Sequence, residues 1–240
     1  MRRLDQLALD FPTWGSRKLV AFLAHEGLIV NRKRVQRLRQ LMGLETTYRG
    51  PRLSDPALRT QRFPYLLRGL TITRPNEVWC ADITYIPMKR GFLYLFAILD
   101  WASRKIMGWR ISTTLDTLFC IECLDLAIKE AGCSPKIFNT DQGAQFTSQE
   151  WIDKVTSHDC LLSHDGKGRW RDNVLIERFW RTLKYDDVYP QAYENGVVLH
   201  KGLKAYMKIY NHVRPHDALD GLRPAEAYLL EAVKPAKVVP

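Results

Sequence analysis

Three acidic side chains in this sequence have positions that could support catalysis at a phosphate. Asp82 lies within a segment rich in β-forming residues, Asp141 follows a short apolar run, and Glu177 lies in a segment with helical periodicity. Three carboxylates brought together repel one another unless cations compensate their charge. Mg²⁺ prefers oxygen ligands of this kind, and a pair of such ions can serve both the attacking and the leaving oxygen in a displacement at phosphorus. The three acids therefore predict a site for phosphodiester transfer.

The segment around Glu177 has the pattern of an amphipathic helix. Glu177, Arg181 and Lys184 fall on one polar face, and Asp172 is placed to cap the start of the helix. The opposite face is apolar and consists of Leu175, Ile176, Phe179, Trp180 and Leu183. Taken alone, this pattern is also that of a surface helix with one salt pair. The two acids upstream, with 35 residues between Asp141 and Glu177, favour the catalytic interpretation.

The elements that would position these acids follow the order β-β-β-α-β-α-β-α. Apolar and β-branched runs predict the strands, and helical periodicity with glycine or capping residues predicts the helices. Thr147 and Glu150 fit a capping box for the second helix. Asp82 is unusual inside a strand, because β-propensity disfavours aspartate there. The expected segments are 78–87, 92–100, 104–111, 115–131, 135–140, 147–158, 160–163 and 172–184.

Residues 1–48 are expected to form a small all-α domain. Two helices, 16–26 and 32–42, are joined by a turn that contains Gly27, and Asn31 is placed to cap the second one. The second helix is strongly basic, which suggests a helix-turn-helix that contacts DNA. A small helical bundle with a solvated basic face would show the same pattern. The candidate DNA-binding residues here are Arg32, Lys33, Arg34 and Arg37. Residues 49–71 have no period and are expected to be a basic linker.

The composition favours a polyanionic partner. The formal net charge is +10 and the isoelectric point is about 9.4, which favours nucleic acid. No apolar run approaches the roughly 18 residues of a membrane span, and no signal sequence is evident, so we expect no membrane contact. The five cysteines are scattered in apolar surroundings and are expected to be reduced. His212 and His216 have no cysteine pair to complete a zinc site.

Four motifs, in order, resemble those of a known family. Residues 79–85, 140–146 and 172–184 resemble the D,D-35-E signature of the retroviral-integrase-like transposases of bacterial insertion sequences, in particular the IS-three family. The segment 210–216, Tyr-Asn-His-Val-Arg-Pro-His, resembles the YNxxRPH element of that family. The helix pair after Gly15 resembles its N-terminal helix-turn-helix. The resemblance covers nearly the whole chain.

The resemblance implies a fold, a reaction and partners. The expected fold is an RNase H-like, integrase-type α/β domain at 72–231, with a mixed five-stranded sheet and flanking helices, a core at about 76–185 and a helical tail. Asp82, Asp141 and Glu177 would bind two Mg²⁺ ions, with Mn²⁺ as an alternative. The reaction would be cleavage at the ends of the element, followed by attack of the freed 3′-OH on target DNA. Homo-oligomers on double-stranded DNA, a protein from the upstream reading frame and a location at the bacterial nucleoid in the cytoplasm are also implied.

The sequence also suggests roles for several residues outside the three acids. Lys167, Arg181 and Lys184 are candidates for phosphate contact, and Asp165 departs from the Ser-Arg-Lys-Gly of many relatives. Asp100 is expected to cap a turn, and Gly143 to permit the turn after Asp141. Arg214 and His216 could stabilise the tail instead of touching DNA. Two alternatives stay open: a metal-dependent nuclease of the same fold, and a DNA-binding regulator without activity.

Overall fold

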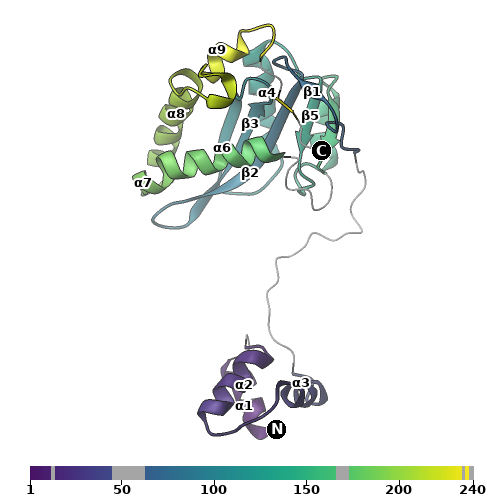
Figure 1. Ribbon diagram of the computed structural model, residues 1–240, viewed down its shortest axis with the longest axis vertical. Coiled ribbons are helices and arrows are strands. Elements are labelled where there is room, and N and C mark those ends of the chain that lie inside the picture. Colours follow the sequence, from purple (N-terminus) through teal and green to yellow (C-terminus); the bar gives the residue numbers. More distant parts are fainter. Residues whose placement is uncertain (12–13, 45–62, 166–172, 234–235, 238–240) are drawn as a thin grey trace. The chain divides into compact units, whose positions relative to one another are not determined.

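The chain forms two compact units, Met1–Pro56 and Ala57–Pro240. The computed structural model describes residues 1–11, 14–44, 63–165, 173–233 and 236–237 (Figure 1). The smaller unit contains α1 (Arg2–Asp10), α2 (Ser16–His25) and α3 (Arg32–Leu41). Its core is formed by Leu4, Leu7, Leu19, Leu23 and Val35. The two expected helices are present, and the Asn31 side chain accepts a hydrogen bond from the Lys33 backbone N–H at 2.9 Å, as expected of an N-cap.

A mixed five-stranded sheet forms the centre of the larger unit (Figure 1). Its spatial order is β4-β3-β2-β5-β6, in which β2, β3 and β4 form an antiparallel meander and β5 and β6 run parallel to β2. The predicted fold class is confirmed, including the order of strands and helices. The strands are β2 (Val78–Pro87), β3 (Phe92–Asp100), β4 (Ile106–Ser112), β5 (Ile137–Thr140) and β6 (Leu161–His164).

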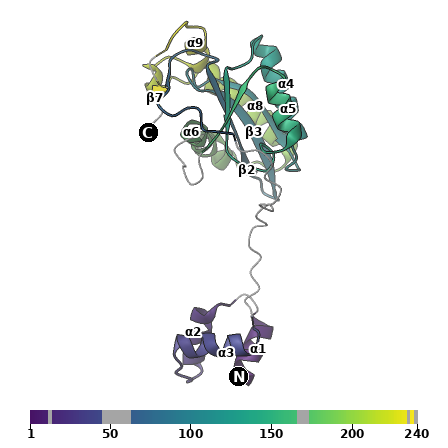
Figure 2. The ribbon, with the colours of Figure 1, turned by 90° about the vertical axis from the view of Figure 1, so that its right-hand side faces the viewer.

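Helices cover both faces of this sheet. On one face lie α4 (Leu118–Ala131) and α5 (Gln149–Thr156), and on the other lies α6 (Val174–Leu183), joined by α8 (Gly196–His212) (Figure 2). Because β3 is covered on both faces, it is apolar almost throughout, as the continuous run in the sequence predicted. Gly132 ends α4 in the left-handed conformation. The capping box expected at Thr147 is wrong, because Ser148 is the N-cap of α5 and its Oγ accepts from the Trp151 N–H.

Shorter elements surround this core. A π-helical turn, η3 (Lys184–Val188), continues α6, and α7 (Tyr189–Gln191) follows it. After α8 come the 3₁₀ turn η4 (Asp217–Leu219) and α9 (Pro224–Tyr228). A two-stranded ribbon pairs β1 (Thr71–Ile72) with β7 (Ala236–Lys237).

Part of the segment that the sequence assigned to the linker lies against the larger unit. Leu67 is fully buried in its core, and the Leu66 backbone N–H donates to Ser163 Oγ at 3.1 Å. The ring of Phe63 packs edge-on against His164, with 5.4 Å between centroids. Residues 63–67 therefore pack against the larger unit, whereas 45–62 lie outside the described residues.

Candidate active site

The parallel pairing of β2 and β5 explains how two of the three acids meet. Cys80 on β2 is the ladder partner of Asn139 on β5. Asp82 and Asp141 each lie two residues further along, and residues two apart on a strand point to the same face. Ala97 stands opposite Asp82 on the neighbouring strand. The two acids therefore reach the same end of the sheet from adjacent strands.

Helix α6 brings the third acid to the same face. Its apolar side, which includes Ile176, Phe179 and Leu183, is buried against the sheet. Two polar bonds join the helix to β2: Trp180 Nε1 donates to Asp82 Oδ2 at 2.9 Å, and Lys184 Nζ donates to Thr84 Oγ1 at 2.8 Å. Glu177 lies one turn before Trp180 and is exposed. The side chains that the sequence singled out thus come from β2, the end of β5, and α6.

The pKa of the Asp82 carboxyl is sensitive to the other two acids. Burial, together with the charges of Asp141 and Glu177, raises the pKa of Asp82 to about 6, although hydrogen bonds from Trp180 and the Ile83 backbone oppose the rise. The charges of both other acids therefore act on Asp82. A carboxylate under this repulsion gains from a nearby cation.

The turn after β5 holds Asp141 in place. The Gly143 backbone N–H donates to Asp141 Oδ1 at 2.9 Å, and a Cβ on Gly143 would lie 2.9 Å from that same oxygen. Gly143 is not among the residues with positive φ, so glycine is needed here for close approach and not for a left-handed turn. Although Asp141 is exposed, the protein packed around it raises the pKa of its carboxyl. The buried His164, at the end of β6, acts on this carboxyl with an opposing charge effect.

A buried polar network lies beneath the two strand ends. Ser163 Oγ donates to Asn139 Oδ1, and Asn139 Nδ2 donates to Asp165 Oδ1, both at 2.8 Å. Gln142 Nε2 donates to the Asp165 carbonyl at 2.7 Å. The Asp165 carboxylate, which departs from the pattern of many relatives, therefore accepts a hydrogen bond from Asn139. The network ties the turn after β5 to the end of β6.

The carboxylates of Asp82, Asp141 and Glu177 are suitable ligands for hard divalent cations, but they do not form a complete metal site. In the part of the chain that the structure describes, no three His, Cys, Asp or Glu side chains form a group that could hold a metal ion. The acids that act on one another are carboxylates, the donors that Mg²⁺ accepts together with substrate oxygens. Asp82, Asp141 and Glu177 thus have the chemistry of Mg²⁺ ligands, although the described residues do not gather them into a group that could hold an ion.

The cations that the sequence proposed near Glu177 differ in position. Lys184 is half-buried beside Thr84; burial lowers the pKa of its ammonium, and the Asp82 charge opposes this. Arg181 is exposed on α6. Lys167 and the proposed cap Asp172 lie outside the described residues, and the residue that precedes α6 is Asn173, whose side chain makes no capping bond.

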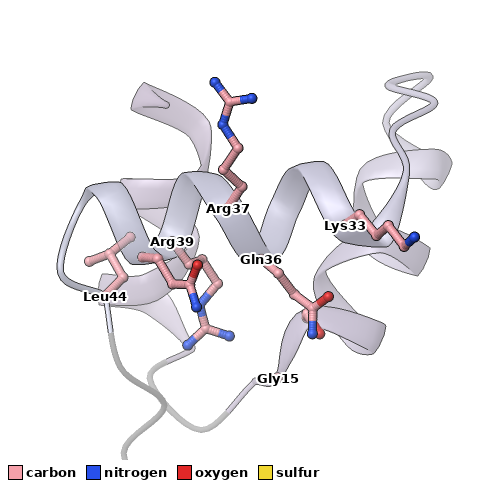
Figure 3. A pocket seen from close by; sticks show the side chains of 8 residues that line it. Gly15, Lys33, Gln36, Arg37, Arg39 and Leu44 are labelled. Carbon is pink, nitrogen blue, oxygen red and sulfur yellow. The ribbon is translucent and has the colours of Figure 1, made fainter.

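The smaller unit carries a polar groove of about 670 Å³ along α3. Lys33 and Arg37 line this groove, whereas Arg32 donates to Ser16 Oγ at 3.3 Å and Arg34 is exposed elsewhere on the helix. Figure 3 shows side chains that line the groove, among which Gln36 and Arg37 leave α3 in different directions. The full lining is Gly15, Ser16, Lys33, Gln36, Arg37, Arg39, Gln40 and Leu44.

The YNxxRPH-like segment makes contacts within the larger unit. Tyr210 packs edge-on against Phe179 of α6, with 4.9 Å between centroids. Asn211 accepts from the Ile106 backbone N–H and donates to the Ile106 carbonyl, both at 2.9 Å. Arg214 forms an ion pair with Asp186. This segment therefore fastens the end of α8 to the edge strand β4 and to the chain after α6.

His216 completes this arrangement by packing its ring edge-on against Tyr210 at 4.9 Å. Asp100, expected to cap a turn, does so: the Ser103 Oγ and backbone N–H and the Asn76 N–H all donate to its carboxylate. These contacts agree with the structural roles considered for Arg214, His216 and Asp100.

Sequence patterns did not indicate three residues of the site. Trp180 was assigned to the apolar face of its helix, and only the structure shows its indole N–H on Asp82. Thr84 and His164 were not singled out. The alternation along β2 would have placed Thr84 on the same face as Asp82, whereas no local pattern indicates His164.

Comparison with known proteins defines the class. Two models described as "Integrase core domain" match residues 72–169 and 158–224, and one described as "HTH-like domain" matches 1–52. The transposase for the insertion sequence element IS904 of Lactococcus lactis subsp. lactis (strain IL1403) is 32% identical over 225 residues, which span 89% of this chain and 86% of the relative. The chain belongs to the IS-three (IS3) family of insertion-sequence transposases.

Solved structures show the same fold at low identity. The integrase in a simian T-cell lymphotropic virus intasome with PP2A regulatory subunit B56 gamma superimposes with a TM-score of 0.58 and 19% identity over 94% of this chain and 79% of that chain. The HTLV-2 integrase catalytic core domain in complex with magnesium gives a TM-score of 0.50 and 20% identity over 65% and 97% of the two chains. Among the described residues, no helix is long and apolar enough to cross a membrane.

Proposed function

We propose that this chain is a DDE-type DNA transposase that cuts the ends of an insertion sequence and transfers the 3′-OH strand into target DNA. The observation that carries the proposal is the convergence of Asp82, Asp141 and Glu177, because the charges of the latter two act on the partly buried carboxyl of the first. Membership of the insertion-sequence transposase family supports it.

The proposed cofactor is a pair of Mg²⁺ ions, with Mn²⁺ as an alternative. Asp82, Asp141 and Glu177 would hold them, and the magnesium complex of the HTLV-2 integrase core supports the choice of ion. Ions bound there would supply activation of the attacking oxygen and stabilisation of the leaving oxygen. The chain itself supplies the arrangement: β2 and β5 fix two carboxylates, and α6 carries the third.

Cations of the chain would hold the DNA backbone. Lys184, bonded to Thr84 beside Asp82, and the exposed Arg181 lie on the helix of Glu177, so they are placed to meet phosphates near the acids. Lys167 stays in the proposal from its place in the sequence alone. These contacts position the DNA and carry little sequence information.

The basic helix α3 would bind the ends of the element. Lys33 and Arg37 line its groove, and Arg32 and Arg34 add charge to the helix. We place this DNA-binding domain at 1–48, a linker at 49–71, of which residues 63–67 pack on the catalytic unit, and the catalytic domain at 72–231. A homo-oligomer on DNA, with the upstream-frame protein of the same element as a further partner and the bacterial nucleoid as the location, completes the proposal, and the viral intasome of the same fold supports the assembly.

A strand-transfer assay tests this function. The substrate is a labelled duplex that ends in the terminal repeat beside the gene, with Mg²⁺ and a target plasmid. Wild type should join the labelled 3′-OH strand to target, whereas Asp82→Asn, Asp141→Asn and Glu177→Gln should each abolish joining and still bind DNA. Full activity in any one variant would remove that residue from the site.

The rival functions have distinct outcomes in the same assay. Cleavage without joining of a pre-cut end would favour a metal-dependent nuclease of this fold. DNA binding with neither cleavage nor joining would favour a regulator without activity.

A further inference from the structure

The indole of Trp180 bonds one catalytic acid from the helix that carries another. Its Nε1 donates to Asp82 Oδ2 at 2.9 Å, and the residue is only 6% exposed. Trp180 follows Glu177 by three positions, so the two residues lie about one helical turn apart on α6. One hydrogen bond thus connects the strand of the first acid to the helix of the third.

The chemistry of an indole suits this place. Its N–H is a donor only, so it can hold a carboxylate oxygen without becoming a ligand for a cation. The bond engages Oδ2 of Asp82 and leaves Oδ1 free of the indole.

A second bond fixes the register between helix and strand. Lys184, four residues after Trp180, donates to Thr84, two residues after Asp82. Four helical residues rise about 6 Å and two strand residues about 6.6 Å, so the spacing of the two bonds matches on both elements. A slip of the helix along β2 would break both bonds and would move Glu177 away from Asp82.

We propose that Trp180 is a positioning residue that orients the Asp82 carboxylate and fixes α6, which carries Glu177, against β2, so that both acids can take part in binding divalent cations. The inference rests on the proposed function. The alternative is that Trp180 only fills space in the core beside Phe179, in which case a phenyl ring at this position would serve equally well.

The test measures Mn²⁺ binding to the full chain without DNA, by electron paramagnetic resonance, for wild type and Trp180→Phe. We expect the Kd for Mn²⁺ to rise by about tenfold in the variant, since removal of a group that orients a metal ligand typically costs 10–100-fold in affinity. Strand transfer should fall at low Mn²⁺ and recover as Mn²⁺ is raised. Trp151→Phe is the matched control, because Trp151 is fully buried and its Nε1 has no partner among the described residues. It should leave the Kd unchanged.

Each outcome of these measurements either supports or overturns the inference. Wild-type Mn²⁺ affinity in folded Trp180→Phe would overturn the inference and leave the proposed function standing. A wild-type chain that neither binds Mn²⁺ nor joins strands would overturn the proposed function, and the inference with it. If Trp180→Phe does not fold, ¹⁵N-indole spectra of wild type replace it. The indole resonance that moves in Asp82→Asn should also move when Mg²⁺ is added to wild type, and an unmoved resonance would refute the inference.

Discussion

The Asp82 carboxylate is held ionised at neutral pH against the preference of its surroundings. Burial and the neighbouring acids raise its pKa to about 6, although hydrogen bonds from Trp180 and the Ile83 backbone oppose the rise. In the folded chain without metal, this carboxylate is therefore less stable than in the unfolded chain, where its pKa is near 3.8. A site that binds cations in this way costs folding stability when the cations are absent.

Asp82→Asn should therefore stabilise the metal-free protein at neutral pH. The folded pKa exceeds the unfolded one, so the folded state binds more protons between about pH 4 and pH 6, and the wild-type free energy of unfolding falls as pH rises through that window. Asparagine avoids this loss and can still accept from Trp180. We expect a gain on the order of 2 kcal/mol at pH 7 that nearly vanishes at pH 4, measured by urea denaturation with EDTA.

The exposed Asp153→Asn serves as the control for this measurement, because its neighbour Gln149 can donate to either side chain. It should change the free energy of unfolding by less than about 0.5 kcal/mol at both pH values. A destabilised Asp82→Asn at pH 7 would mean that hydrogen bonds to the carboxylate outweigh its burial.

At this scale the sequence singled out three candidate acids but did not indicate how the protein holds them. Residue types and spacing singled out Asp82, Asp141 and Glu177 because carboxylates are costly to gather. Trp180 escaped because helical periodicity assigns a residue to a face and cannot show which group on a distant strand its N–H meets. The sequence placed Gly143 in the turn after Asp141, but it could not show that glycine is needed there for close approach to the Asp141 carboxylate, which depends on side-chain positions.

At the scale of elements, the tail segment 210–216 holds α6, the helix that carries Glu177, against the rest of the larger unit. Tyr210 packs on Phe179 of α6, Arg214 pairs with Asp186 just after it, and Asn211 satisfies both backbone groups of Ile106 on the edge strand. The contacts join three elements that are distant in the sequence. They explain the segment without any contact to DNA.

Asn211→Ala should weaken this fastening. The backbone N–H and C=O of Ile106 would both lose their partner, and an unsatisfied group of this kind costs about 1–3 kcal/mol. We expect the free energy of unfolding to fall by about 2 kcal/mol in urea titrations at unchanged m-value. Lys208→Ala, at an exposed position on the same helix, should stay within about 0.5 kcal/mol of wild type. An equal loss in both variants would point to the helix and not to the Asn211 bonds.

Helix α3 supports a prediction about DNA affinity. Lys33→Ala and Arg37→Ala remove cations that line its groove, so each should weaken DNA binding and reduce the slope of log K against log salt by about one. Fluorescence anisotropy at several salt concentrations measures this. Lys18→Ala on α2 removes an equal charge at an exposed position outside that lining, and a matching change in its slope would show that net charge alone matters.

Element type and order were predictable because apolar periodicity and turn residues are local signals. The family resemblance implied a mixed five-stranded sheet, whereas the full spatial order β4-β3-β2-β5-β6 was not predicted. The π-helical turn after α6 and the pairing of β1 with β7 were not predicted. Both depend on contacts made only after folding, such as the Arg214–Asp186 ion pair and a partner strand at the other end of the domain.

At the scale of the whole molecule, each of the two units has its own hydrophobic core. Leu4, Leu7, Leu19, Leu23 and Val35 form the core of the smaller unit, and two other clusters on the faces of the sheet form that of the larger. The acids lie in one unit and the α3 groove in the other. Since each unit buries its own apolar side chains, folding of one does not require the other.

A chain that lacks Met1–Pro56 should therefore keep its metal site and lose recognition of the element ends. We expect residues 57–240 to fold cooperatively and to bind Mn²⁺ with wild-type affinity, because Asp82, Asp141, Glu177 and Trp180 all belong to that unit. Its affinity for terminal-repeat DNA should fall to that for unrelated DNA of equal length, since the cations that remain contact phosphates and not bases. Retained preference for the terminal repeat would place end recognition in the catalytic unit, and lost Mn²⁺ binding would mean that the smaller unit helps to form the site.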